Sequence, residues 1–112
     1  MRKLLVIALV VGCLGTLASV AMAATRSVKV GDDYYVRPSG VPTVTVTKGT
    51  TVKWNFRGNS AHTVTVSKGP VKFNSGARSS GSYRRKMKRR GTYRIYCVIH
   101  TAASQSMKLV VK

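Results

Sequence analysis

The sequence predicts a single all-β domain, built as a sandwich or barrel of about seven to eight strands. Three observations support this fold class. Apolar residues recur at every second position from residue 27 onward, turn-forming residues interrupt that pattern at short intervals, and no stretch has a helical period. A hydrophobic fraction of 44% is sufficient for a packed core and argues against a disordered chain.

The expected strands follow from the alternation and the turns between them. In chain order they cover residues 41–47, 51–56, 62–67, 83–88, 92–97 and about 105–111. The side chains expected on buried faces are Val52, Trp54 and Phe56, then His62, Val64 and Val66, then Tyr93, Ile95 and Cys97, then Met107, Leu109 and Val111. The Ser/Gly-rich stretch 74–81 is expected to be a loop.

Residues 1–23 have the composition of a signal peptide. A charged start at Arg2 and Lys3 precedes an apolar run, and Ala21 and Ala23 supply the small residues of a cleavage site. We therefore expect the domain to be residues 24–112, exported to the periplasm, the cell-envelope surface or the medium. Lipid anchoring at Cys13 is a less favoured alternative, because the apolar run continues past it. After residue 24 no apolar run is long enough to span a bilayer.

The side chains that carry chemistry are few. Without the leader the chain keeps one cysteine, Cys97, and two histidines, His62 and His100, all at expected strand ends or in loops. Singly, a buried cysteine is usually a small hydrophobe and a lone histidine a packed core group. Together, one thiolate and two imidazoles are the ligand set of a trigonal type 1 copper centre. Zinc is less well suited, because it usually takes a fourth strong ligand or a water.

The ligand segments resemble those of a cupredoxin, the small blue copper proteins of the plastocyanin kind. Residues 61–64 resemble the first ligand loop, and residues 93–100, ending in Cys97-x-x-His100, resemble the second. The resemblance covers essentially all of residues 24–112. It implies a Greek-key β-sandwich that binds one copper, cycling between Cu(I) and Cu(II), in a monomeric one-electron carrier that is not an enzyme.

The axial position departs from the family pattern. In plastocyanin-like chains a methionine follows the second histidine by five residues, and Gln105 stands there in this chain. In the family, the residues two, four and six positions after the axial methionine point into the core. Met107 stands two positions after Gln105, so Met107 is expected in the core and Gln105 is favoured as the axial ligand, with Met107 as the alternative. An amide oxygen is an accepted axial donor, as in the stellacyanin variant of the family. Thr63 is a second departure, since the family commonly has Asn after the first histidine, where it ties the two ligand loops together.

Charge gives the second functional signal. The chain has 20 Lys and Arg against 2 acidic residues, and loss of Arg2 and Lys3 with the leader leaves a net charge of +16. Six of the cations lie within residues 84–90, a pattern also typical of an edge strand protected from aggregation. This charge is expected to steer the protein toward an acidic redox partner or an anionic cell-envelope surface.

The same composition excludes other functions. Catalysis by paired carboxylates is excluded, because Asp32 and Asp33 are the only acids and are adjacent. No nucleic-acid partner is expected, because no array of aromatics is present for base stacking. Two alternatives to electron transfer stay open: a copper-binding or copper-delivery protein of the cell envelope, and a metal-free cationic surface-binding domain on the same scaffold.

Overall fold

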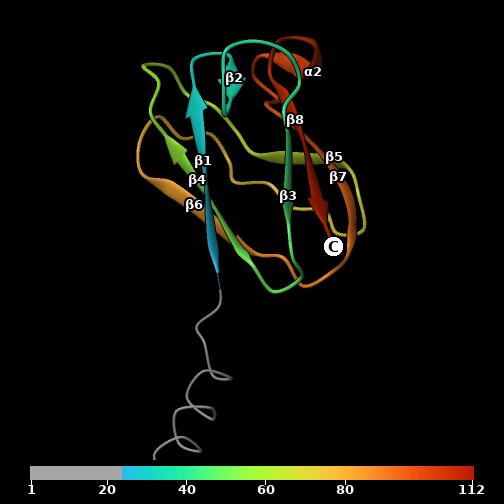
Figure 1. The fold of residues 1–112 in the computed structure, drawn as a ribbon. Coiled ribbons are helices and arrows are strands. Elements are labelled where there is room, and N and C mark those ends of the chain that lie inside the picture. Colours follow the sequence, from blue (N-terminus) through green and yellow to red (C-terminus); the bar gives the residue numbers. More distant parts are fainter. Residues whose placement is uncertain (1–23) are drawn as a thin grey trace, which may run out of the picture.

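Alternating burial along the chain produces two four-stranded sheets that face each other, as the computed structural model shows for residues 24–112 (Figure 1). The first sheet has the strand order β2-β1-β4-β6 and the second the order β3-β8-β7-β5. The all-β sandwich predicted from the sequence is therefore confirmed. The predicted signal peptide, residues 1–23, and the alternative anchor at Cys13 lie outside the described residues.

The elements have the following bounds. They are β1 (Thr25–Gly31), β2 (Tyr34–Tyr35), β3 (Thr43–Val46), β4 (Thr51–Phe56), β5 (Thr65–Lys68), β6 (Ser82–Lys86), β7 (Gly91–Tyr96), α2 (Thr101–Ser104) and β8 (Ser106–Val111). Both sheets are mixed, because β1 pairs with β4 and β3 pairs with β8 in parallel, whereas the other pairs are antiparallel.

The core lies between the sheets and includes all of the predicted alternate residues, together with residues of β1, β2, β3 and the loops. Along β4 and β8 every second side chain is buried, and Trp54, Tyr93 and Leu109 are fully enclosed. A one-residue shift in register would turn these side chains to solvent, so the alternation specifies the pairing. The basic strand β6 is an edge strand, which agrees with charges protecting an open sheet edge from association.

Several local features differ from the prediction. The strands β1 and β2 precede the first of the expected strand ranges. The strand expected at residues 62–67 begins only at Thr65, and His62 makes an isolated bridge with Arg78. The basic strand ends at Lys86, two residues early, and a four-residue helix, α2, follows His100. A helix of one turn is too short to display a hydrophobic period, so the sequence pattern could not indicate it.

The sandwich has two distinct ends. β7 and β8 run antiparallel, and the end of β7, the start of β8 and α2 meet at one end, at the top of Figure 1. The turn between β1 and β2 lies at this same end, whereas the connection from β6 to β7 lies at the other (Figure 1). Within residues 24–112, no helix has the length and apolar character needed to cross a bilayer.

Candidate metal centre

His62 is held rigidly by its own backbone. Its N–H donates to the carbonyl of Arg78 at 2.9 Å, and the N–H of Arg78 donates back at 2.9 Å. The adjacent Thr63 carbonyl accepts a hydrogen bond from the hydroxyl of Tyr35, which is itself completely buried. These bonds attach the segment to β2 and to the segment before β6, so the fully buried His62 ring has a fixed position.

The second candidate segment is a loop closed at its neck. The Cys97 N–H donates to the Gln105 carbonyl at 3.1 Å, the Thr101 N–H donates to the Cys97 carbonyl at 2.9 Å, and the Gln105 N–H donates to the Thr101 carbonyl at 3.0 Å. These bonds return the chain from the end of β7 to the start of β8. Cys97 and Gln105 are buried at the neck, and His100 lies on the loop above them.

The two segments bring three predicted residues into one cluster. Ligand atoms of His62, Cys97 and His100 all lie within 4.8 Å of one another, and the two imidazole centroids are 4.8 Å apart. The Cys97 Sγ is 3.4 Å from the Nδ1 of His100. Burial raises the pKa of the Cys97 thiol, but N–H groups of Thr63, His100 and Ile99 directed at the sulfur outweigh it and lower the pKa overall. The site therefore favours the thiolate, the form that binds metal.

Thr63 ties the two segments together. Its N–H donates to the Cys97 Sγ at 3.4 Å, and its Oγ1 accepts a hydrogen bond from the Val98 N–H at 3.0 Å. The tie that the family usually makes through Asn is thus present here through a threonine hydroxyl. Hydrogen bonds of this kind orient the groups that surround a metal and fix their distances.

Gln105 presents its carbonyl oxygen to the cluster. The Nε2 amide donates to the backbone carbonyls of Tyr34 at 3.0 Å and Gly31 at 3.2 Å, so both hydrogens are used. Its Oε1 then lies 2.9 Å from the Nδ1 of His62. Met107, the alternative axial residue, is buried two residues further along β8 among the residues of the hydrophobic core.

Two carboxylates that sequence analysis treated only as an argument against acid catalysis belong to this site. The Asp32 Oδ1 lies 3.0 Å from the Nε2 of His62, and the Asp33 Oδ1 lies 3.3 Å from the Nε2 of His100. An ionised carboxylate only accepts hydrogen bonds, so each places the imidazole proton on Nε2. Both Nδ1 lone pairs are then directed inward. An acidic pair in a turn of an otherwise basic chain was the signal that would have identified them.

Asp32 also holds the loop that precedes His62. It accepts hydrogen bonds from the backbone N–H groups of Asn59 and Ser60 and from the Ser60 hydroxyl, at 3.0–3.1 Å. Gly58 permits this approach, because a Cβ there would collide with the carboxylate. The bonds from Asn59, His62 and Ser60 together hold the pKa of Asp32 far below its ordinary value of 3.8.

The arrangement gathers atoms that a cation can use as ligands. The Nδ1 of His62 and the Oε1 of Gln105 lie 2.9 Å apart in a buried space, beside the Cys97 sulfur. In the metal-free protein a proton on Nδ1 can join these two atoms, and a bound cation can take its place. Two imidazoles, one thiolate and one amide oxygen match the donors of a type 1 copper site.

Comparisons with solved structures agree with this fold. The Cu(I) form of an amicyanin variant superimposes with a TM-score of 0.65 at 25% identity, over 85% of this chain and 88% of that one. Pseudoazurin from Hyphomicrobium denitrificans gives 0.62 at 17% identity, over 79% and 75%. A copper-containing nitrite reductase from Thermus scotoductus gives 0.64 at 16% identity, over 82% of this chain but only 23% of its own length. No family model and no curated protein sequence matches the chain.

These similarities confirm the predicted cupredoxin fold. Amicyanin and pseudoazurin are cupredoxins, and cupredoxins bind copper. The cluster of His62, Cys97 and His100 fits a type 1 copper site, which makes copper the metal that this chain is suited to hold.

The first prediction concerns the Thr63 tie. Replacement of Thr63 by Val keeps the shape of the side chain but leaves the Val98 N–H without an acceptor. We expect the free energy of unfolding of the metal-free protein to fall by about 1–2 kcal/mol, from the loss of the part-buried bond to Val98 and of the bond between the Thr63 and Thr65 hydroxyls. Thr63→Ser, which keeps the hydroxyl, is the control. Equal loss in both variants, measured by urea denaturation, would show that the methyl group and not the hydrogen bond matters.

The second prediction concerns Asp32. Because its pKa in the folded protein lies below the ordinary 3.8, the carboxylate stabilises the fold above that pH and loses this effect as the pH falls through the lower folded pKa. Asp32→Asn is therefore expected to lower the melting temperature of the metal-free protein at pH 7, by an amount that shrinks below pH 3.8. Asp33→Asn removes the same charge but fewer hydrogen bonds, so its effect at pH 7 should be smaller. Identical pH profiles for the two variants would contradict the assignment.

Proposed function

We propose that this protein is an exported one-electron carrier, in which His62, Cys97 and His100, together with Gln105, would hold a type 1 copper. It performs no chemistry on a substrate and exchanges electrons with a partner protein. The observation that supports the proposal is the cluster of ligand atoms from His62, Cys97 and His100 within 4.8 Å of one another, with the Gln105 Oε1 2.9 Å from the Nδ1 of His62.

In this proposal the protein keeps the donors of the copper in fixed positions. Bound copper supplies exchange of one electron between its cuprous and cupric states, and the donor set suits both. The chain contributes rigidity: the bridge at His62, the closed neck at Cys97 and Gln105, and the Thr63 tie leave the donors little freedom to move. Donors that are already in place reduce the rearrangement that accompanies gain or loss of an electron.

His100 is the proposed site of electron entry and exit. Its side chain is 26% exposed, whereas that of His62 is fully buried. Val98 and Ile99, next to it in the chain, are 45% and 49% exposed. Ala102 and Ala103 are also exposed and too small to hold a partner away. An apolar surface of this kind suits the small, transient interfaces of redox encounters.

The net positive charge supports an acidic partner. A field of this sign raises the rate of encounter with an anionic protein and loses that effect as salt screens it. The apolar surface around His100 would then provide the contact itself. Residues 24–112 are proposed to act as a monomer after export, at the cell envelope or beyond it.

The third prediction is optical. Copper(II)-loaded protein should have an intense visible absorption band from the thiolate-to-copper transition, and Cys97→Ser should abolish it. Met107→Leu, a core substitution of similar volume, should retain the band. A colourless copper-loaded protein would refute the type 1 assignment. A coloured protein without rapid, reversible electron exchange would instead favour copper storage or delivery.

The fourth prediction separates the two axial candidates. A thioether in place of the harder amide oxygen favours Cu(I), so Gln105→Met should raise the reduction potential, measured by voltammetry. Met107→Leu should leave the potential unchanged, because that side chain belongs to the core. A potential that moves with Met107 and not with Gln105 would reverse the assignment.

A further inference from the structure

Both acidic side chains of residues 24–112 face the outer nitrogen of a histidine at the metal centre. The Asp32 Oδ1 lies 3.0 Å from the Nε2 of His62, and the Asp33 Oδ1 lies 3.3 Å from the Nε2 of His100. Lys and Arg side chains are far more numerous in this part of the chain, yet neither carboxylate forms an ion pair with any of those within it. One carboxylate for each imidazole is therefore a feature of this site and not a general pairing of opposite charges.

The two carboxylates are supported to different degrees. Asp32 also accepts the hydrogen bonds from Asn59 and Ser60, so its charge serves the loop before His62 as well. For Asp33, the contact with His100 is the one polar contact of the side chain within residues 24–112. The Asp33 backbone has a φ of 66°, in the left-handed region that Asp tolerates better than most residues. The effect of Asp33 on the site can thus be tested with little disturbance of the loop.

A carboxylate beside the outer nitrogen of an imidazole changes what the inner nitrogen prefers to bind. It orients the ring through the Nε2 proton and makes the Nδ1 a stronger electron donor. Together with the Cys97 thiolate, the two carboxylates surround the site with negative charge. The attraction between opposite charges grows with the size of either charge, so such a site favours a metal ion of higher positive charge over one of lower charge.

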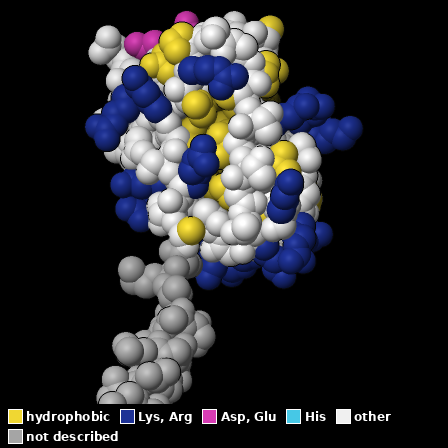
Figure 2. Space-filling model, in the orientation of Figure 1, with side chains coloured by type: hydrophobic (Ala, Val, Ile, Leu, Met, Phe, Trp, Pro, Cys, Tyr) yellow, Lys and Arg dark blue, Asp and Glu magenta, His cyan; other side chains and the backbone are white. Residues whose placement is uncertain are grey.

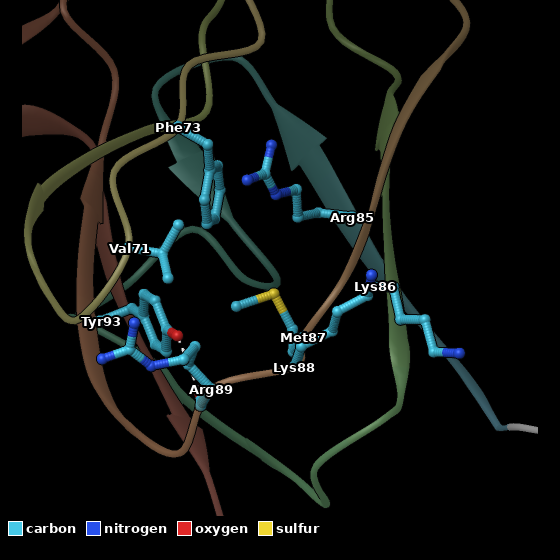
Figure 3. Close-up of a pocket in the computed structure, with 8 residues that line it drawn as sticks. All are labelled: Val71, Phe73, Arg85, Lys86, Met87, Lys88, Arg89 and Tyr93. Carbon is cyan, nitrogen blue, oxygen red and sulfur yellow. Dashed lines mark hydrogen bonds between the residues drawn. The ribbon is translucent and has the colours of Figure 1, made fainter.

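A separate cluster of charged side chains lies away from this site. Four cations, Lys88 among them, line a cavity of about 460 Å³ between the end of β6 and β7, at the opposite end of the sandwich (Figure 3). Tyr93, which also lines the cavity, precedes Cys97 by four residues of extended chain, or about 13 Å. Exposed charges separated by more than about 10 Å are largely screened at 0.1 M salt. A change of charge at Lys88 is therefore a suitable control for one at the metal centre.

We propose that Asp32 and Asp33 are positioning residues that make the metal centre bind Cu(II) in preference to Cu(I), and so lower its reduction potential. Each acts through the imidazole that it contacts. The inference rests on the proposed function, because it concerns the oxidation state of a bound copper. It adds to the effect of the Gln105 amide oxygen, which favours the same oxidation state from the fourth position.

The fifth prediction replaces Asp33 by Asn, which keeps an oxygen acceptor and removes the charge. We expect the ratio of the Cu(II) to the Cu(I) binding constant to fall about tenfold, an effect typical of groups that orient metal ligands. For a one-electron couple, this corresponds to a rise of about 59 mV in the reduction potential, measured by voltammetry. Asp33→Glu keeps the charge and should stay closer to the parent than Asp33→Asn. Lys88→Gln also changes the net charge by one unit, at the far end, and should leave the potential unchanged.

Zinc tests the same placement without a change of oxidation state. Asp33→Asn should weaken Zn²⁺ binding about tenfold, measured by competition with a chelator, and Lys88→Gln should leave it unchanged. An unchanged potential in Asp33→Asn, or a shift of equal size in Lys88→Gln, would overturn the inference. If the copper-loaded protein is not blue, the proposed function fails and the zinc affinities decide alone. An unchanged zinc affinity in Asp33→Asn then overturns the inference as well.

Discussion

The metal centre depends on which nitrogen of each histidine carries the proton. Asp32 and Asp33 each contact the Nε2 of one imidazole, which leaves the Nδ1 of His62 facing the Gln105 amide oxygen and the Nδ1 of His100 facing the Cys97 sulfur. The four-residue turn that contains these carboxylates also supplies, from Gly31 and Tyr34, the carbonyls that orient the Gln105 amide. One short turn therefore determines the direction of three of the four donors. The β-sandwich provides the fixed positions from which that turn and the ligand loops approach one another.

Much of this arrangement could be predicted from the sequence. It depends on the alternation of apolar residues with a period of two and on the small number of side chains that can bind a metal. Period-two alternation located the buried faces of β4, β7 and β8, and parity along β8 placed Gln105 and Met107 on the same buried side. A single thiol and two histidines left few ways to build a metal site. The roles of Asp32, of Tyr35 and of the one-turn helix α2 could not be predicted, since they arise from contacts between segments distant in the chain. Thr63 was recognised as a departure, but only the structure shows that its hydroxyl reaches Val98.

The few acidic side chains of residues 24–112 lie at one end of the molecule, whereas Lys and Arg side chains are spread over the visible face (Figure 2). The two acidic side chains of residues 24–112 are used at the metal centre, where they orient imidazoles, and the cations of β6 and the segment after it surround an apolar cavity. Cations on an edge strand discourage strand-to-strand association.

The account rests on a single metal ion held by sulfur and two imidazole nitrogens, and X-ray absorption at the copper edge tests this most directly. The fine structure of the copper-loaded protein should contain one short copper–sulfur distance and two imidazole nitrogens, and the sulfur contribution should disappear in Cys97→Ser. A first coordination sphere of nitrogen and oxygen alone, unchanged by that substitution, would contradict the account.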